Sequence, residues 1–308
     1  MMNGELQYQL LPNRPLEQAD VLIQPIPHEL TVSYKSGTRN APEAILVATD
    51  QLELYEEDGG WSPFKHMGVR VLPPVDKRLY EANADFHARL TAYASELPDG
   101  ALLLSLGGEH SVTASLVLGR LPVPGTVIHV DAHADLRPQF EGSEFSHAAP
   151  MHRIREAGHS IVMAGVRSLL DAEAERVAND AGIRCYTDRA LHTEGGWREL
   201  MDELASLTGP VYLTVDVDAL DPGQAPGVGT PQPGGLGWYQ LLAIVETIMG
   251  NTNARVAGCD IVEMIPEASC VTDMVAAKLS QKMLSCWGLQ QGFAQRQAAG
   301  SQTEVDYE

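Results

Sequence analysis

Three apolar stretches of this sequence each lead directly into side chains that can bind a metal ion, and this arrangement limits the possible folds more than any other feature. The stretches cover residues 101–106, 126–130 and 211–215 and are rich in Leu, Val and Ile, which is typical of buried strands. The potential ligands that follow them are His110, Asp131, His133, Asp135, Asp216 and Asp218. Because sites in open α/β sheets form at the carboxyl ends of the strands, the three stretches predict one shared site.

The spacing of these residues supports the same interpretation. Asp131, His133 and Asp135 stand at alternate positions, and so do Asp216 and Asp218. Alternation of this kind is how a strand that runs into a loop directs its side chains to one side. Any one of the stretches could carry its polar residues by chance, but three stretches of the same design favour a metal site.

The rest of the chain predicts the fold class. Segments with strand and helix patterns alternate about eight times, which indicates a mostly parallel sheet covered by helices on both faces. The ligands must converge, so we expect one domain over 1–308, with an irregular N-terminal arm over about 1–19 and a loose polar tail over about 290–308. An amphipathic helix is expected over 77–97, with Leu79 on its apolar face. The expected strands cover 20–27, 68–74, 101–106, 126–130, 160–166, 183–187, 210–218 and 254–263.

Composition excludes several classes of partner. The chain has 41 acidic and 21 basic residues, a formal net charge of -20, so binding to nucleic acid phosphates or to an anionic membrane surface is not expected. There is no apolar run of the roughly 20 residues needed to cross a bilayer, and the N-terminus does not resemble a signal peptide. The four cysteines have no CxxC spacing, so we expect them to be reduced thiols. We therefore expect a cytoplasmic protein.

The chemistry of the ligand set indicates a centre with two metal ions. Two imidazoles and four carboxylates provide four negative charges, which balance two divalent cations. Oxygen-rich ligation favours Mn²⁺, while Ni²⁺, Co²⁺ and Fe²⁺ remain possible. Two such ions about 3.5–4 Å apart can activate a shared water, so the expected reaction is hydrolysis at a polar carbon or phosphorus atom. A phosphate ester would need cationic side chains, and only Arg137 follows the central strand.

Five sequence segments together resemble the ureohydrolase family of arginases and agmatinases. In chain order they are GGEHS, DAHADLR, FSHAAP, DVDALDPGQAPGVGTPQPGGL and DIVEMIP, within a resemblance that covers about 20–289. The resemblance implies a three-layer α/β/α sandwich with a sheet of about eight parallel strands. It also implies a di-manganese centre and the release of urea from a guanidino compound. Relatives form trimers or dimers of trimers, so a homo-oligomer, trimer or hexamer, is expected.

The resemblance also implies roles for individual residues. The metal ligands of the family fall on the same six residues, and one Asp of each pair is expected to bridge the ions. Glu263 falls on the carboxylate that receives the guanidinium, and a fork of N–H donors is held well by such a group. His147 falls on the histidine that transfers a proton to the leaving amine, for which its usual pKa is suited. His129 receives no ligand role and is expected to lie behind the ligands, as is Asp260.

The substrate expected from the sequence is agmatine, hydrolysed to putrescine and urea by a hydroxide bridging the metals. The loop after Asp135 lacks the Asn and Ser pattern with which arginases hold an α-amino acid. N1-aminopropylagmatine, guanidinobutyrate and arginine are alternative substrates, and a metal-binding homologue without catalysis is an alternative class. Gln232 stands where many relatives carry Glu. Arg137 is expected to form an ion pair with Glu141 or Glu144, or else to contact a substrate carboxylate.

Overall fold

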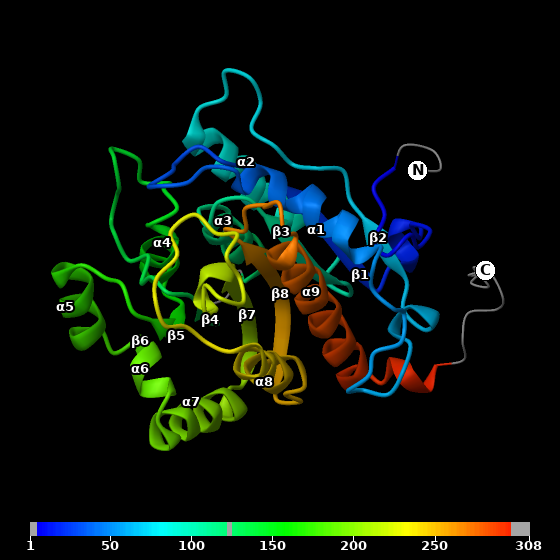
Figure 1. Cartoon of the computed structure of the whole chain (residues 1–308). Helices are drawn as coiled ribbons and strands as arrows, with labels where there is room; N and C mark the ends of the chain where they lie inside the picture. The colour runs from blue at the N-terminus through cyan, green and yellow to red at the C-terminus, as the bar shows by residue number, and fades with distance from the viewer. Residues whose placement is uncertain (1–4, 122–124, 297–308) are drawn as a thin grey trace.

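The computed structural model describes residues 5–121 and 125–296 and consists of a central sheet between two layers of helices (Figure 1). The eight strands pair in the order β2-β1-β3-β8-β7-β4-β5-β6, and every pair is parallel. The strands are β1 (Val21–Ile26), β2 (Val69–Val71), β3 (Leu102–Gly107), β4 (Thr126–Val130), β5 (Ser160–Val166), β6 (Ile183–Thr187), β7 (Gly209–Asp216) and β8 (Ala254–Val262). The predicted parallel α/β fold is confirmed.

The helices pack on both faces because the strands are apolar on both sides. In β3, Leu102 and Leu104 face one buried cluster, whereas Leu103 faces the other. The first cluster is covered by α1, α7, α8 and α9, and the second by α2, α3 and α4. The helices are α1 (Ala41–Thr49), α2 (Asn83–Glu96), α3 (Val112–Arg120), α4 (Pro150–Glu156), α5 (Asp171–Asn179), α6 (Asp188–Leu191), α7 (Glu194–Ser206), α8 (Trp238–Met249) and α9 (Val271–Gln290).

One predicted helix is shorter than its sequence pattern indicates. The helix expected over 77–97 begins only at Asn83, and Leu79 is 82% exposed instead of facing the core. Tyr80 has a φ of 65°, a left-handed conformation that a helix cannot contain. The carboxylate of Glu81 accepts a hydrogen bond from the Arg78 backbone N–H and pairs with Arg89 at 2.7 Å, so these residues form a turn instead.

The two ends of the chain pack on the domain within the described residues. Tyr8, in the predicted N-terminal arm, is buried and its hydroxyl lies 2.9 Å from Ser280 Oγ on α9. After α9, a short turn buries Phe293, and Arg296 pairs with Asp20 at 2.8 Å. The remainder of the predicted tail, 297–308, lies outside the described residues. None of the helices in the described part of the chain is long and apolar enough to cross a membrane.

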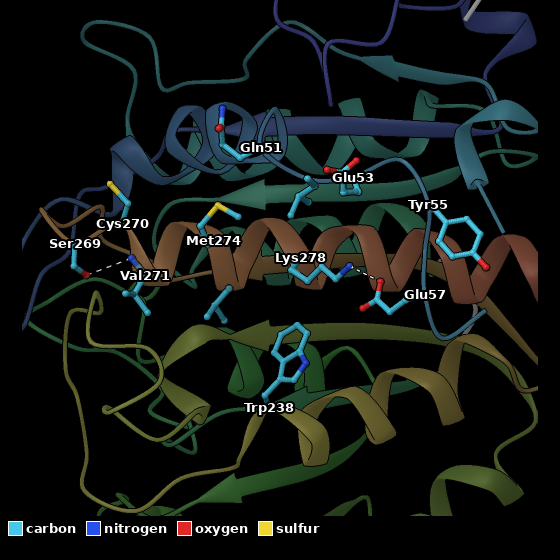
Figure 2. A pocket seen from close by; sticks show the side chains of 12 residues that line it. Gln51, Glu53, Tyr55, Glu57, Trp238, Ser269, Cys270, Val271, Met274 and Lys278 are labelled. Carbon is cyan, nitrogen blue, oxygen red and sulfur yellow. Dashed lines mark hydrogen bonds and ion pairs between the residues drawn. The ribbon is translucent and has the colours of Figure 1, made fainter. Parts of the chain in front are cut away.

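A groove of about 930 Å³ lies between α9, the segment 51–57 and the start of α8 (Figure 2). Its walls include Tyr55, Trp238 and Met274, and Lys278 pairs with Glu57 along its floor at 2.9 Å. None of the six predicted ligands lines this groove. The six predicted ligands lie instead at the carboxyl ends of the central strands.

Two buried histidines near α2 predict a loss of stability in mild acid. Burial lowers the pKa of His28 to about 4 and that of His87 to about 3, with Arg153 contributing at His87. The unfolded chain takes up these protons near pH 6.5 and the folded chain does not, so the free energy of unfolding should fall as the pH drops from about 6.5 to 4.

The measurement is urea denaturation of metal-free protein at pH 7 and pH 5, for the parent chain and for His87→Gln. Each histidine is expected to account for about 2 kcal/mol of the decrease in the free energy of unfolding between pH 7 and pH 5. The decrease should therefore be about 2 kcal/mol smaller in His87→Gln than in the parent chain. His66, which is bonded to the Arg296 carbonyl near the surface, provides the control substitution His66→Gln. Equal losses in the parent and His87→Gln would contradict this explanation.

Candidate metal centre

The six predicted ligands meet at the carboxyl ends of three strands at the centre of the sheet. β3, β7 and β4 supply them, with β8 between β3 and β7. Asp131 follows β4 directly, and Asp216 is the last residue of β7. Asp218 was expected on the strand but lies in a 3₁₀ turn, where its backbone N–H donates to the Asp216 carboxylate at 2.8 Å. The turn keeps both carboxylates at the same edge.

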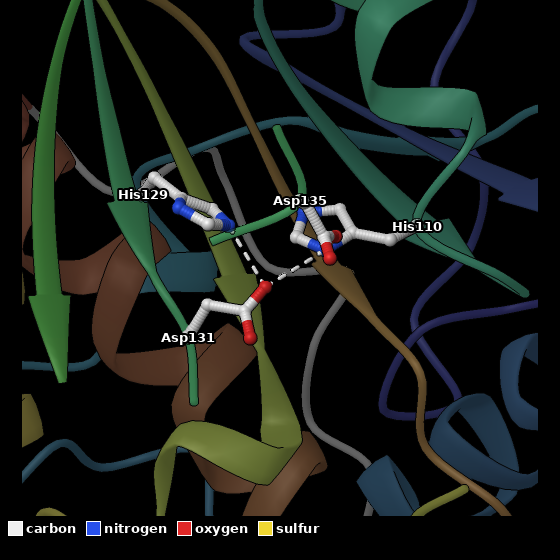
Figure 3. A group of neighbouring side chains, drawn as sticks. All are labelled: His110, His129, Asp131 and Asp135. Atoms are coloured by element: carbon white, nitrogen blue, oxygen red, sulfur yellow. Dashed lines mark hydrogen bonds and ion pairs between the residues drawn. The ribbon is translucent and has the colours of Figure 1, made fainter. Parts of the chain in front are cut away.

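His110 lies at the centre of the first ligand group. Its Nδ1 atom is 3.1 Å from Asp131 Oδ2, 3.1 Å from Asp135 Oδ2 and 3.4 Å from Asp216 Oδ2. Figure 3 shows two of these carboxylates, Asp131 and Asp135, beside the His110 ring. Asp135 reaches this position with a φ of 50°, a left-handed conformation of the kind often found at functional sites. One imidazole nitrogen thus faces three carboxylates.

His133 defines a second group beside the first. Its Nδ1 atom is 3.0 Å from Asp218 Oδ2 and 3.6 Å from Asp131 Oδ1. The two oxygens of Asp131 therefore point to different groups, Oδ2 to His110 and Oδ1 to His133. This division is what a carboxylate that bridges two ions requires.

The residues present fit the two metal ions that the chemistry implies. His110 Nδ1 is buried and has no hydrogen-bond partner among the described residues. Burial raises the pKa of Asp216 well above its usual range, and the neighbouring Asp218 and Asp131 carboxylates raise it further. Carboxylates packed together in this way are stabilised by a divalent cation, and oxygen with some imidazole is a ligand set that Mn²⁺ accepts.

His129 lies behind the ligands, as expected. Its Nε2 atom is 2.8 Å from Asp131 Oδ2, and its side chain is fully buried. Figure 3 shows the His129 and His110 rings directed at the same carboxylate oxygen of Asp131. His129 is close enough to belong to the same group of ligand atoms. Its contact with Asp131 fixes the orientation of the carboxylate shared by the two groups.

Glu263 lies beside the first group, directly after β8. Its φ of 63° turns the chain, and its Oε1 accepts the His110 backbone N–H at 2.7 Å. Burial raises the pKa of Glu263 to about 8, and the Glu109 and Asp135 carboxylates contribute. A cation placed against this carboxylate would favour its ionised form.

His147 lies on the loop before α4 and is held by two hydroxyl groups. Its Nδ1 is 2.8 Å from Thr31 Oγ1 and its Nε2 is 2.7 Å from Ser33 Oγ. Thr31 Oγ1 also accepts the His147 backbone N–H at 3.0 Å. Burial lowers the pKa of His147, and the Asp135 carboxylate opposes this shift.

Thr31 and Ser33 could not be identified from the sequence, because they lie in an irregular loop more than a hundred residues before His147. The buried carboxylate of Glu109 holds this loop, since its Oε2 accepts the backbone N–H groups of Leu30 at 2.7 Å and Thr31 at 2.6 Å. The only sign in the sequence that this loop is held near His147 was the carboxylate of Glu109 next to His110.

A cavity of about 400 Å³ opens onto the site. Its lining includes His133, Asp135, His147 and Glu263 together with Arg137 and Gln232. The ion pair expected for Arg137 is wrong: no carboxylate of the described residues pairs with it, and Glu144 pairs with Arg153 instead, at 3.1 Å. The Arg137 guanidinium lies 4.7 Å from the Phe140 ring centroid.

Comparisons with known proteins match nearly the whole chain. Residues 19–286 match the arginase family. The chain is 37% identical over 280 residues to the N(1)-aminopropylagmatine ureohydrolase of Synechocystis sp., covering 88% of this chain and 90% of that protein. It is 33% identical over 283 residues to the agmatinase of Bacillus anthracis, with 88% and 93% covered. The crystal structure of a hypothetical agmatinase from Burkholderia thailandensis superposes with a TM-score of 0.82 at 28% identity, covering 94% and 93% of the two chains.

Proposed function

The chain belongs to the arginase family and is a ureohydrolase, and we propose that it hydrolyses N1-aminopropylagmatine to urea and spermidine. The observation that carries this proposal is the 37% identity to the Synechocystis enzyme of that name. The sequence alone favoured agmatine, and agmatine is the second candidate because the Bacillus anthracis agmatinase is 33% identical. Both molecules are cations, which suits a chain with a net charge of -20.

We propose that two Mn²⁺ ions bind in this centre. His110, Asp131, Asp135 and Asp216 would hold the first ion, because their atoms surround His110 Nδ1. His133, Asp131 and Asp218 would hold the second. When bound, the ions would supply a water activated as a nucleophile at neutral pH.

The role proposed for Glu263 is to hold the guanidinium of the substrate. Its carboxylate lines the cavity beside the first ligand group and is fixed by the His110 backbone N–H. A carboxylate can accept two N–H groups of a planar guanidinium, which orients the guanidinium carbon for attack.

The role proposed for His147 is to deliver a proton to the nitrogen of the leaving amine, as the bond between that nitrogen and the guanidinium carbon breaks. It lines the same cavity as Glu263. Because burial lowers its pKa, the protonated ring gives up its proton readily. Thr31 and Ser33 hold both ring nitrogens and so aim the ring.

Replacing Thr31 with valine is expected to lower kcat about 10- to 100-fold with little change in KM, because it removes the hydroxyl that orients His147 but no group proposed to bind substrate. Steady-state kinetics of Thr31→Val and Thr31→Ser provide the test. Serine keeps the hydroxyl and should retain most of the activity. A raised KM with unchanged kcat in Thr31→Val would contradict the assigned role.

The proposed substrate is tested by urea release from the Mn²⁺-loaded protein. N1-aminopropylagmatine, agmatine, guanidinobutyrate and arginine are compared by kcat/KM. The highest value is expected for N1-aminopropylagmatine. A higher kcat/KM for agmatine would make agmatine the substrate and leave the proposed hydrolysis unchanged. A preference for guanidinobutyrate would indicate that Arg137, which lines the cavity, contacts the substrate carboxylate.

A further inference from the structure

A buried chain of hydroxyl groups lies behind His110, on the side of the ring away from the carboxylates. His110 Nε2 is 3.0 Å from Thr214 Oγ1. Thr214 Oγ1 in turn lies 3.5 Å from Thr113 Oγ1. The Thr113 hydroxyl donates to Asp260 Oδ2 at 3.0 Å, and the Tyr212 hydroxyl donates to the same oxygen at 2.9 Å. The side chains of Asp260, Thr214, Tyr212 and Thr113 are all fully buried.

Strand pairing explains why these groups meet. Thr214 on β7 is the direct partner of Asp260 on β8, so their side chains emerge on the same face of the sheet. Thr113 approaches from the first turn of α3, directly after His110. Asp260 does not line the cavity, and its hydrogen-bond donors among the described residues are the hydroxyl groups of Thr113 and Tyr212. Burial of a carboxylate is costly for folding, and no basic side chain forms an ion pair with Asp260 among the described residues.

The direction of each hydrogen bond between His110 and the hydroxyl groups follows from which atoms carry a proton and which can only accept one. A histidine that binds a metal through Nδ1 must carry its proton on Nε2, and that N–H needs an acceptor. Thr214 Oγ1 is the atom in position to accept it. The single proton of the Thr214 hydroxyl then points to Thr113 Oγ1, because Thr113 donates its own proton to the Asp260 carboxylate.

We propose that Asp260 and Thr214 are positioning residues for the first metal ion. Through Thr113 and Thr214, the Asp260 carboxylate holds His110 in the tautomer that leaves Nδ1 free to face Asp131, Asp135 and Asp216. This inference rests on the metal centre of the proposed function, but not on the identity of the substrate. Groups that hold the outer nitrogen of a ligating histidine typically change metal affinity about 10- to 100-fold when they are removed.

The experiment is a Mn²⁺ titration of the metal-free full chain, followed by the electron paramagnetic resonance of free Mn²⁺, with no substrate present. Thr214→Val removes the hydroxyl but keeps the branched shape, and should weaken one of two binding events about 10- to 100-fold. Thr214→Ser keeps the hydroxyl and should bind like the parent. Asp260→Asn should also weaken the same event, because the amide is a poorer acceptor than a carboxylate.

Tyr212→Phe is the matched control, because it removes a buried hydroxyl from Asp260 without interrupting the path to His110. It should bind both ions nearly as the parent does. Thermal melts of the metal-free proteins report whether each variant folds, and Asp260→Asn carries the test if Thr214→Val does not fold. Parent-like binding in the folded variants, or equal weakening in Tyr212→Phe and Thr214→Val, would overturn the inference. A parent chain that binds no Mn²⁺ would overturn the metal centre as well.

Discussion

Replacing Asp131 with asparagine is expected to remove metal ions from both ligand groups and to lower urea release by about 1000-fold or more, a loss of about 4 kcal/mol in transition-state stabilisation. The two oxygens of Asp131 point to different groups, toward His110 at 3.1 Å and toward His133 at 3.6 Å. Asparagine has the same shape but no negative charge, and its amide nitrogen cannot act as a ligand. Metal content by mass spectrometry and urea release together provide the measurement.

The control for this substitution is Asp202→Asn, which removes an exposed carboxylate on α7. It should keep the metal content and activity of the parent. Because Asp131 also accepts His129 Nε2 at 2.8 Å, the melting temperature of metal-free Asp131→Asn must be measured as well. A folded Asp131→Asn protein with full metal content and normal turnover would contradict the proposed centre.

Replacing Glu263 with glutamine is expected to lower kcat/KM by a factor between roughly 30 and several thousand, while the metal content stays unchanged. Removing one partner of a buried charge pair costs about 2–5 kcal/mol, which corresponds to this range. Glutamine retains a side-chain oxygen that can accept the His110 backbone N–H, so His110 should stay in place. Steady-state kinetics and metal analysis of the same sample separate the two effects.

The matched control for this change is Glu267→Gln, a half-buried carboxylate four residues further along the same loop that does not line the cavity. It should behave as the parent. Loss of metal from Glu263→Gln would mean that Glu263 supports the metal centre and not the guanidinium. Unchanged kcat/KM with a full metal content would mean that the guanidinium is held elsewhere.

Local patterns were sufficient to predict the sheet and most of its strands. β3, β4 and β5 are mostly apolar runs, as expected for parallel strands buried on both faces. Residues 77–82 were mispredicted because Leu79 fits a helical apolar face, whereas the turn there depends on the contact between Glu81 and Arg89. Such a contact forms only after the chain has folded, so periodicity could not reveal it.

That the six proposed ligands lie close together could be predicted for the same reason, because each one stands at or after the end of a strand whose position the pattern defines. Thr31, Ser33 and Thr214 could not be predicted as partners of the histidines. The first two approach His147 through a loop that the Glu109 carboxylate holds in place, and Thr214 reaches His110 only through the pairing of neighbouring strands. Arg137 was mispredicted because Glu141, the first acidic residue after it in the sequence, is not its partner in space, and Phe140 is.

The most direct test of the two-metal ureohydrolase is a titration of the metal-free chain with Mn²⁺ in which bound metal and urea release are measured on the same samples. N1-aminopropylagmatine and agmatine serve as substrates. The predicted result is that urea release rises with metal occupancy and reaches its maximum at two ions per chain. A chain that binds two ions and releases no urea from either compound, or from guanidinobutyrate or arginine, would contradict the account and indicate a metal-binding protein without this catalysis.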